Sequence, residues 1–166
     1  HSYCSDGFLS PAGVVRAAAS RGVELLALAD HDTVSGLAQA ENESARLKVS
    51  FLRAVEISTC VDDSLHILGY GIRVQNPELK SRLKDYRLRR VERVKRMVKK
   101  LSGAGLDISF DEIEIAGAKS VGRPHIADVL RSKGMVASRR EAFQKYLMPG
   151  RPGYAPPLGP SVEEAI

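Results

Sequence analysis

The stretch LLALADHDTVSG, residues 25–36, decides the fold because its character changes halfway along. It begins within an apolar run at 23–29 that contains a single glutamate, a pattern typical of a β-strand covered on both faces. The run then ends in Asp30, His31 and Asp32, which are two carboxylates and an imidazole. The apolar half predicts a strand, and the polar half predicts a site at its carboxyl end.

Helices and strands alternate around this stretch. Pro11 follows a serine, which is typical of a helix start, and this helix should run through Ala19. A second helix is expected over about 34–47, followed by strands within 49–58 and 64–72. A strand, a helix of crossover length and another strand form a βαβ unit, so the sequence predicts an α/β fold with a parallel sheet.

The pattern becomes helical after residue 76. Asn76 precedes a proline, which predicts a helix start, and apolar residues then recur at helical spacing until the sequence SGAG. Further helix starts are expected at Ser109, Pro124 and Ser138, before the Pro/Gly-rich connector MPGRPGYAPPLGP. We therefore divide the chain into an α/β body at 1–76, a helical insertion at 77–150 and a connector returning to the body at 151–166.

The composition is that of one globular domain or part of one. Among the 166 residues 43% are hydrophobic, and no apolar run is long enough to span a membrane. Two cysteines are too few for a disulfide scaffold, which favours a reducing, cytoplasmic location. The chain starts at His1 and stops soon after a helix-start signal at Ser161, so we expect both ends to be cut.

Imidazoles and carboxylates recur at the expected strand ends. In parallel α/β folds reactive groups gather at the carboxyl ends of strands, where His31 and Glu56 fall. Mixed imidazole and carboxylate ligands suit Zn, Mn or Fe, so a multinuclear hydrolytic site is one hypothesis. Taken singly, each residue also fits a plainer role: a helix cap beside a surface histidine, a hydrogen-bonded core histidine at His66, and a solvated carboxylate at Glu56.

Five ordered motifs carry a resemblance to a known family. HSYCSDG, LLALADHDTVSGLAQA, FLRAVEIS, SLHILGYGI and GRPHIADVL together resemble the polymerase and histidinol phosphatase (PHP) family, in its stand-alone phosphoesterase branch. The likeness is strongest to members that remove the 3′-phosphate from nucleoside 3′,5′-bisphosphates or trim short RNA from its 5′ end. It implies a distorted (β/α)7 TIM-like barrel, incomplete in this chain, with an α-helical insertion covering the site.

The resemblance also implies a metal centre, expected to hold three divalent ions of Mn, Zn or Fe. The residues that match the family's metal ligands are His1, Asp6, His31, Glu56 and His66. His31 and Glu56 are the expected catalytic residues, and Glu56 matches the ligand that bridges two metals. Three features of the family are absent: the first His of HxH, a later His and a C-terminal Asp-x-His. We attribute their absence to truncation, and we expect the fragment alone to be inactive.

The sequence KSVGRPHIADVL, residues 119–130, has two interpretations. Pro124 starts a helix whose N–H groups could receive an anion, with Arg123 and Ser120 as further donors. The alternative is ordinary capping, with Arg123 in a surface ion pair. The resemblance favours phosphate binding, and we place His125 in the same pocket as a proton donor or phosphate contact.

A basic segment at 78–101 carries eleven Lys or Arg against three acids, a local balance of +8 within a net charge of +5. It could contact the phosphates of a polynucleotide, although Tyr86 is its single aromatic residue. The other interpretations are a solvated helix face and the steering of small anionic substrates.

The resulting expectation is an enzyme that hydrolyses the 3′-phosphate of nucleoside 3′,5′-bisphosphates, trims short 5′-phosphorylated RNA, or both, by a metal-activated hydroxide. Its partners are then a nucleotide or short RNA, without a membrane or an evident obligate protein partner. The alternatives are a histidinol-phosphate phosphatase, a proofreading module of a polymerase and a non-catalytic nucleic-acid-binding module.

Overall fold

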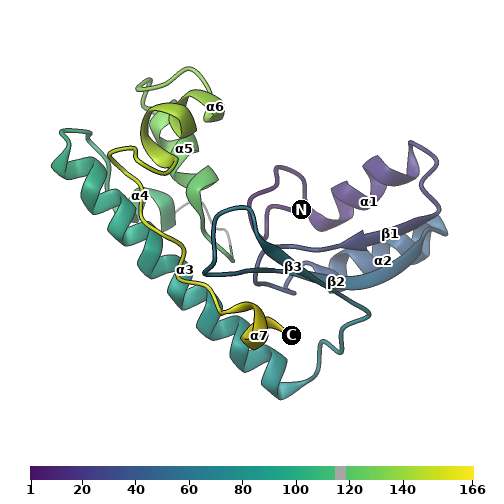
Figure 1. Cartoon of the computed structure of the whole chain (residues 1–166). Helices are drawn as coiled ribbons and strands as arrows, with labels where there is room; N and C mark the ends of the chain where they lie inside the picture. The colour runs from purple at the N-terminus through teal and green to yellow at the C-terminus, as the bar shows by residue number, and fades with distance from the viewer. Residues whose placement is uncertain (115–118) are drawn as a thin grey trace.

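The computed structural model describes residues 1–114 and 119–166 (Figure 1). It is a mixed α/β structure in which a three-stranded sheet and a group of helices are joined by one long helix. No helix in the described part of the chain is long and apolar enough to cross a membrane.

The sheet has the order β1-β2-β3, formed by Leu25–Leu28, Ser50–Ser58 and His66–Tyr70. β1 and β2 are parallel, as the βαβ pattern predicts. β3 is antiparallel to β2, so the sheet is mixed, and the prediction of a parallel sheet is wrong for β3. The reason is the short connection at 59–65, because a parallel return needs a crossover of about a dozen residues or more.

The helices α1 (Pro11–Ala19) and α2 (Leu37–Leu47) pack against each other and against the sheet. Ser10 caps α1 by accepting a hydrogen bond from the Gly13 N–H, as expected from its place before a proline. The core of this part contains Val15, Leu28, Leu37 and Ala40. β1 is an edge strand of the described sheet, and Leu25 is exposed, so the expected cover on both faces is incomplete.

α3 (Pro77–Gly103) is shared between the sheet and the helical group. Its first half packs on the sheet through Leu83 and Tyr86. Its second half joins α4 (Phe110–Glu114), α5 (Arg123–Ser132), α6 (Arg139–Ala142) and the π-helical turn η1 (Phe143–Leu147) in a separate core. Residues such as Met97, Leu101, Ile126 and Leu130 are fully buried there. We call the helical group after α3 the cap.

The connector runs back along α3 from the cap to the sheet, as Figure 1 shows, and ends in α7 (Val162–Ala165). Two glycines allow this close approach. A Cβ on Gly153 would lie 2.4 Å from Leu101, and one on Gly159 would lie 1.9 Å from the Ser58 carbonyl oxygen. The connector therefore passes over the end of β2, where the polar residues of the candidate site lie.

Candidate metal centre

Asp30 organises the loop that begins the chain. Its buried carboxylate accepts hydrogen bonds from the Ser2 N–H and Ser2 Oγ, both at 2.6 Å, and from Ser5 Oγ at 2.7 Å. The loop then turns tightly at Gly7, where a Cβ would lie 2.4 Å from the His1 carbonyl oxygen. Asp30 is thus a structural anchor that presents His1 and Asp6 to the end of the sheet.

Sheet topology brings the other three expected ligands to the same edge. His31 follows β1 and forms an isolated parallel bridge with Glu56, which lies near the end of β2. His66 is the first residue of β3, and its partner in the antiparallel pair is Ser58. The amino end of β3 therefore meets the carboxyl ends of β1 and β2.

The five predicted metal ligands, Glu56 among them, come together in one cluster. His1 Nε2 lies 2.5 Å from Glu56 Oε2, and His66 Nδ1 lies 3.3 Å from Glu56 Oε1. His31 Nδ1 lies 4.0 Å from Glu56 Oε2, while His31 Nε2 lies 3.7 Å from Asp6 Oδ2. Asp6 Oδ1 is 2.7 Å from His1 Nδ1 and completes the cluster.

Protonation of the cluster follows from its geometry. Hydrogen bonds to Asp6 and Glu56 raise the pKa of His1 to about 10. Burial would raise the pKa of each carboxyl, but the interaction with His1 holds the pKa of both below their ordinary values. Burial and the nearby charge of Arg90 lower the pKa of His31 to about 3, so its ring is neutral at pH 7. One histidinium thus holds two carboxylates together.

The donor set fits a divalent cation. His1 must lose its proton when a metal binds, and His1, His31 and Glu56 then each offer a ligand atom; these atoms lie within 4.8 Å of one another. His66 Nδ1 is buried, faces Glu56 and has no hydrogen-bond partner in the described part of the chain. Its Nε2 lies 3.2 Å from the Asp63 carbonyl oxygen, a contact that leaves Nδ1 free to act as a ligand. Imidazole and carboxylate donors together suit Zn, Mn or Fe.

A second layer of polar residues supports His31, and the sequence interpretation missed it. Ser58 Oγ lies 3.2 Å from His31 Nδ1 and accepts a hydrogen bond from Arg90 Nη1 at 2.6 Å. Arg90 also pairs with the fully buried Asp32 at 3.1 Å and donates to the Val121 carbonyl oxygen. Because Arg90 belongs to α3, this network ties the long helix to the end of the sheet.

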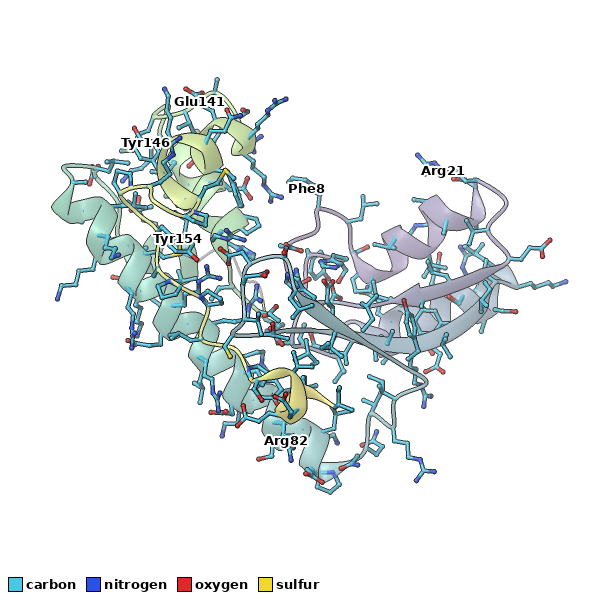
Figure 2. All side chains as sticks on the ribbon, viewed as in Figure 1. Phe8, Arg21, Arg82, Glu141, Tyr146 and Tyr154 are labelled. Carbon is cyan, nitrogen blue, oxygen red and sulfur yellow. The ribbon has the colours of Figure 1, made fainter. Side chains whose placement is uncertain are left out.

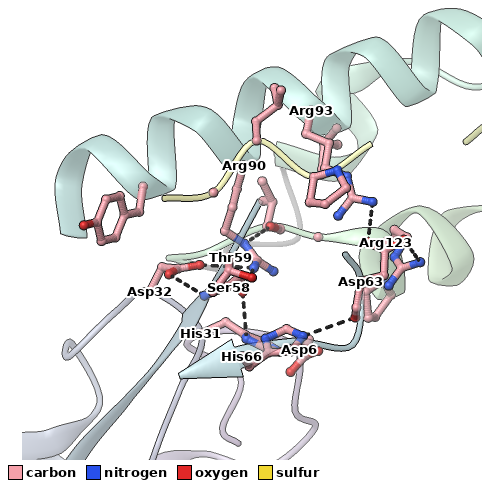
Figure 3. A pocket seen from close by; sticks show the side chains of 18 of the residues that line it. Asp6, His31, Asp32, Ser58, Thr59, Asp63, His66, Arg90, Arg93 and Arg123 are labelled. Carbon is pink, nitrogen blue, oxygen red and sulfur yellow. Dashed lines mark hydrogen bonds and ion pairs between the residues drawn. The ribbon is translucent and has the colours of Figure 1, made fainter. Parts of the chain in front are cut away.

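A cleft of about 270 Å³ opens beside the cluster. Asp6, His31 and His66 line one wall, and Arg90, Arg93 and Arg123 line the other, as Figure 3 shows. The cleft therefore places imidazoles and carboxylates opposite guanidinium groups. Such an arrangement can receive an anion between cations on both sides once metals occupy the cluster.

The basic helix has two different sides. Arg90 and Arg93 point into the cleft, and Arg87 donates to the Asp32 carbonyl oxygen at 3.0 Å. The other arginines form surface ion pairs with acids four residues earlier, namely Arg82–Glu78, Arg89–Asp85 and Arg96–Glu92 (Arg82 is labelled in Figure 2). A solvated helix face is thus confirmed for one side only. Arginines at 87, 90 and 93 are spaced three residues apart and so lie on one face of the helix. This spacing is the signal in the sequence that could have identified the arginines facing the sheet.

The residues of GRPHIADVL divide between the cleft and the structure behind it. Arg123 lines the cleft and pairs with Asp63 at 2.9 Å, so it has both the expected position and the alternative ion pair. Ser120 is buried outside the cleft lining, and its Oγ has no hydrogen-bond partner within the described residues. Its backbone N–H donates to the Cys4 carbonyl oxygen.

His125 has a different role from the expected one. Its Nδ1 accepts the Gly122 N–H at 3.0 Å, so Nε2 carries the proton and donates to the Ser5 carbonyl oxygen at 2.9 Å. Burial lowers the pKa of His125, which keeps the ring neutral. Both nitrogens are used by the main chain, and His125 is absent from the cleft lining. It is a link between the cap and the loop that carries Asp6, and the placement as proton donor or phosphate contact is wrong.

Comparison with known proteins points to phosphoester hydrolysis. A 3′,5′-nucleoside bisphosphate phosphatase of Chromobacterium violaceum is 40% identical over 169 residues, covering 100% of this chain and 59% of the relative. A 5′-3′ exoribonuclease, Rnm, of Escherichia coli is 33% identical over 170 residues, covering 100% of this chain and 58% of the relative.

A solved structure from Bifidobacterium adolescentis, described as a metal-dependent phosphoesterase, matches with a TM-score of 0.90. It is 32% identical, and the match covers 99% of this chain and 59% of that chain. No protein-family model matches. The chain spans about three fifths of the length of the curated relatives that it matches, and it is similar to named hydrolases of phosphoesters along its whole length.

Proposed function

We propose that the intact protein is a metal-dependent phosphoesterase of the PHP type. The observation that carries this proposal is the meeting of the five expected ligands, Glu56 among them, in one cluster opposite a wall of arginines. The names of the similar proteins support the reaction class. We further propose that the described sheet belongs to a distorted (β/α)7 barrel, with residues 77–150 as its insertion, in a cytoplasmic protein.

The metals would be held by His1, Asp6, His31, Glu56 and His66, in a centre proposed to take three ions of Mn, Zn or Fe. When bound, such ions lower the pKa of water and neutralise charge on the phosphoryl group and the leaving oxygen. Glu56 lies between three imidazoles and is placed to contact more than one ion. Ser58 and the Asp63 carbonyl oxygen hold the rings of His31 and His66 in position.

The arginine wall serves the phosphate. Arg123 and Arg93 present guanidinium groups to the cleft, and their planar N–H pairs match phosphate oxygens. Arg90 is engaged by Asp32 and Ser58, so we assign it to holding the wall against the sheet. Ser120, being buried outside the cleft lining, has no assigned contact with the phosphate.

The proposed substrates are a nucleoside 3′,5′-bisphosphate and short 5′-phosphorylated RNA. The two curated relatives are named a 3′,5′-nucleoside bisphosphate phosphatase and a 5′-3′ exoribonuclease, and the guanidinium groups of Arg93 and Arg123 at the cleft suit a substrate with several negative charges. Histidinol phosphate carries one phosphate and a cationic amine, which the arginine wall repels. A module that only binds nucleic acid has no use for a cluster of metal ligands at the end of the sheet.

The test is a comparison of substrates with the intact, Mn²⁺-loaded protein. We expect phosphate release from adenosine 3′,5′-bisphosphate, or shortening of a 5′-phosphorylated RNA, to exceed phosphate release from histidinol phosphate at least tenfold in kcat/KM. Preference for histidinol phosphate would replace the proposed substrate class. No hydrolysis of any of the three substrates, with metal shown to be bound, would refute the phosphoesterase function.

A further inference from the structure

Asp63 lies between two arginines on the cap side of the cleft. Its Oδ1 accepts a hydrogen bond from Arg93 Nη2 at 2.6 Å, and its Oδ2 accepts one from Arg123 Nη1 at 2.9 Å. Figure 3 shows the three side chains meeting beside the metal-ligand cluster. They come from three elements, namely the β2–β3 loop, α3 and α5, and each is exposed by less than a fifth.

The charges in this group do not balance. One carboxylate faces two guanidinium groups, while the neighbouring Arg90 has its own partner in Asp32. Burial lowers the pKa of Arg123; the charge of Asp63 opposes this effect, and the charge of Arg93 adds to it. A phosphate dianion would neutralise both guanidinium groups, whereas a carboxylate neutralises one.

The loop that carries Asp63 is fixed through its main chain. At its neck Thr59 Oγ1 donates to the Leu65 carbonyl oxygen, and the Cys60 N–H donates to the Pro160 carbonyl oxygen, both at 2.8 Å. The Asp63 carbonyl oxygen is itself held by His66. The Asp63 side chain can therefore rotate away from the arginines without disturbing the contact that orients His66.

We propose that Asp63 is a resident counter-ion of Arg93 and Arg123 and competes with a phosphate group of the substrate for them. The inference rests on the proposed function and adds a rule of substrate choice to it. A terminal phosphomonoester, which carries two charges, displaces Asp63. An internal phosphodiester carries one charge, as Asp63 does, and gains nothing by the exchange. The competition thus selects nucleotides and RNA ends that bear a terminal phosphate.

The test measures binding of inorganic phosphate to the intact, metal-loaded protein by titration calorimetry. We expect Asp63→Asn to tighten the Kd for phosphate about tenfold, because a charged competitor is removed while the carbonyl oxygen used by His66 stays. Asp85→Asn is the matched control. That carboxylate forms an exposed ion pair with Arg89 outside the cleft lining, and its variant should leave the Kd unchanged.

Two further measurements locate the effect. Adding Arg123→Gln to Asp63→Asn should cancel the gain, because half of the arginine pair is lost. A crystal structure of the wild-type protein with phosphate should show phosphate oxygens bound to Arg93 and Arg123 and the Asp63 carboxylate turned away. This measurement uses the wild-type protein, so it does not depend on whether the variants fold.

Opposite results identify a different role for Asp63. If Asp63 only organises the arginines, Asp63→Asn weakens phosphate binding. Weaker or unchanged binding overturns the proposal, as does a phosphate-bound crystal structure in which Asp63 remains between the two arginines. Because these are binding measurements, a protein that hydrolyses no phosphoester but shows the tenfold gain would refute the proposed function and leave this inference standing.

Discussion

The two walls of the cleft are built in different ways. On the sheet wall, His31 and His66 stand at or near strand ends beside Glu56, and the strand pairing brings all three to one edge. On the cap wall, Arg93 and Arg123 come from helices that pack in a separate hydrophobic core. The sheet wall gathers donors around a shared carboxylate, whereas the cap wall gathers cations around Asp63.

This difference assigns a different function to each wall. A carboxylate between imidazoles is a site for cations, and two guanidinium groups around one carboxylate form a site for anions. Changes on the sheet wall should therefore remove metal and turnover together. Changes on the cap wall should alter substrate affinity or the attachment of the cap, and leave bound metal in place.

The largest expected effect comes from the centre of the sheet wall. Glu56→Gln should abolish turnover and most metal binding in the intact protein, because it removes the carboxylate that three imidazoles share. The fold should persist, since the amide is nearly isosteric with the carboxylate.

Phosphate release measures turnover, metal analysis measures the bound metal, and thermal unfolding measures the stability of the fold. Glu41→Gln, at an exposed ion pair with Arg53, should behave as wild type. Wild-type turnover in Glu56→Gln would remove Glu56 from the centre.

Replacing an arginine of α3 should lower the stability of the protein only when that arginine lies on the side of the helix that faces the sheet. Arg90→Met leaves the buried Asp32 without its partner and should lower the free energy of unfolding by about 3 kcal/mol. Arg96→Met breaks a surface pair with Glu92 and should cost less than about 0.5 kcal/mol. Denaturant unfolding of both variants measures the difference. Equal losses would show that the inward and outward arginines are not distinct.

Substrate affinity should depend on the cap wall. Arg123→Ala should raise KM for a nucleoside bisphosphate about tenfold, with metal content unchanged, because a charge-assisted contact to phosphate is lost. Arg131→Ala, at an exposed residue of the same helix, serves as the control. Steady-state kinetics of both variants measure kcat and KM. An unchanged KM in Arg123→Ala would place Arg123 outside the substrate pocket.

The smallest expected effect is a change in the pH dependence of stability when His125, which links the cap to the loop carrying Asp6, is replaced. The folded-state pKa of His125 lies below the ordinary value of 6.5, so its contribution to stability is present above pH 6.5 and is lost as pH falls through the lowered pKa. In the metal-free protein, the melting temperature of wild type should exceed that of His125→Asn at pH 7.5, and the gap should narrow at pH 5.5. A gap that widens in acid would show that His125 is charged in the folded protein.

The strand ends of the sheet wall could be predicted from the sequence, whereas its set of ligands came from the resemblance of five motifs to the PHP family, because each residue alone also fits a plainer role. The apolar run before His31 marks a strand end through local signals, without knowledge of distant contacts. The same local signals placed the helix caps at Asn76, Ser109, Ser138 and Ser161, and hydrogen bonds of these residues confirm each start.

The cap wall could not be predicted in the same way because long-range packing sets its orientation. The charge of the segment 78–101 is visible in the sequence, but which arginines turn inward depends on how α3 lies across the sheet and the cap. His125 was misplaced for the same reason. Its hydrogen-bond partner, the Ser5 carbonyl oxygen, is 120 residues away in the sequence. Every residue has a main-chain carbonyl, so the amino-acid sequence does not indicate which one His125 contacts.

The most direct test of the central claim is an anomalous-difference map of the intact protein crystallised with Mn²⁺. We predict peaks within coordination distance of the Glu56 carboxylate and of the His31 and His66 rings, on the wall opposite Arg123. Peaks elsewhere on the protein, or none at Glu56 with Mn²⁺ in excess, would contradict the account.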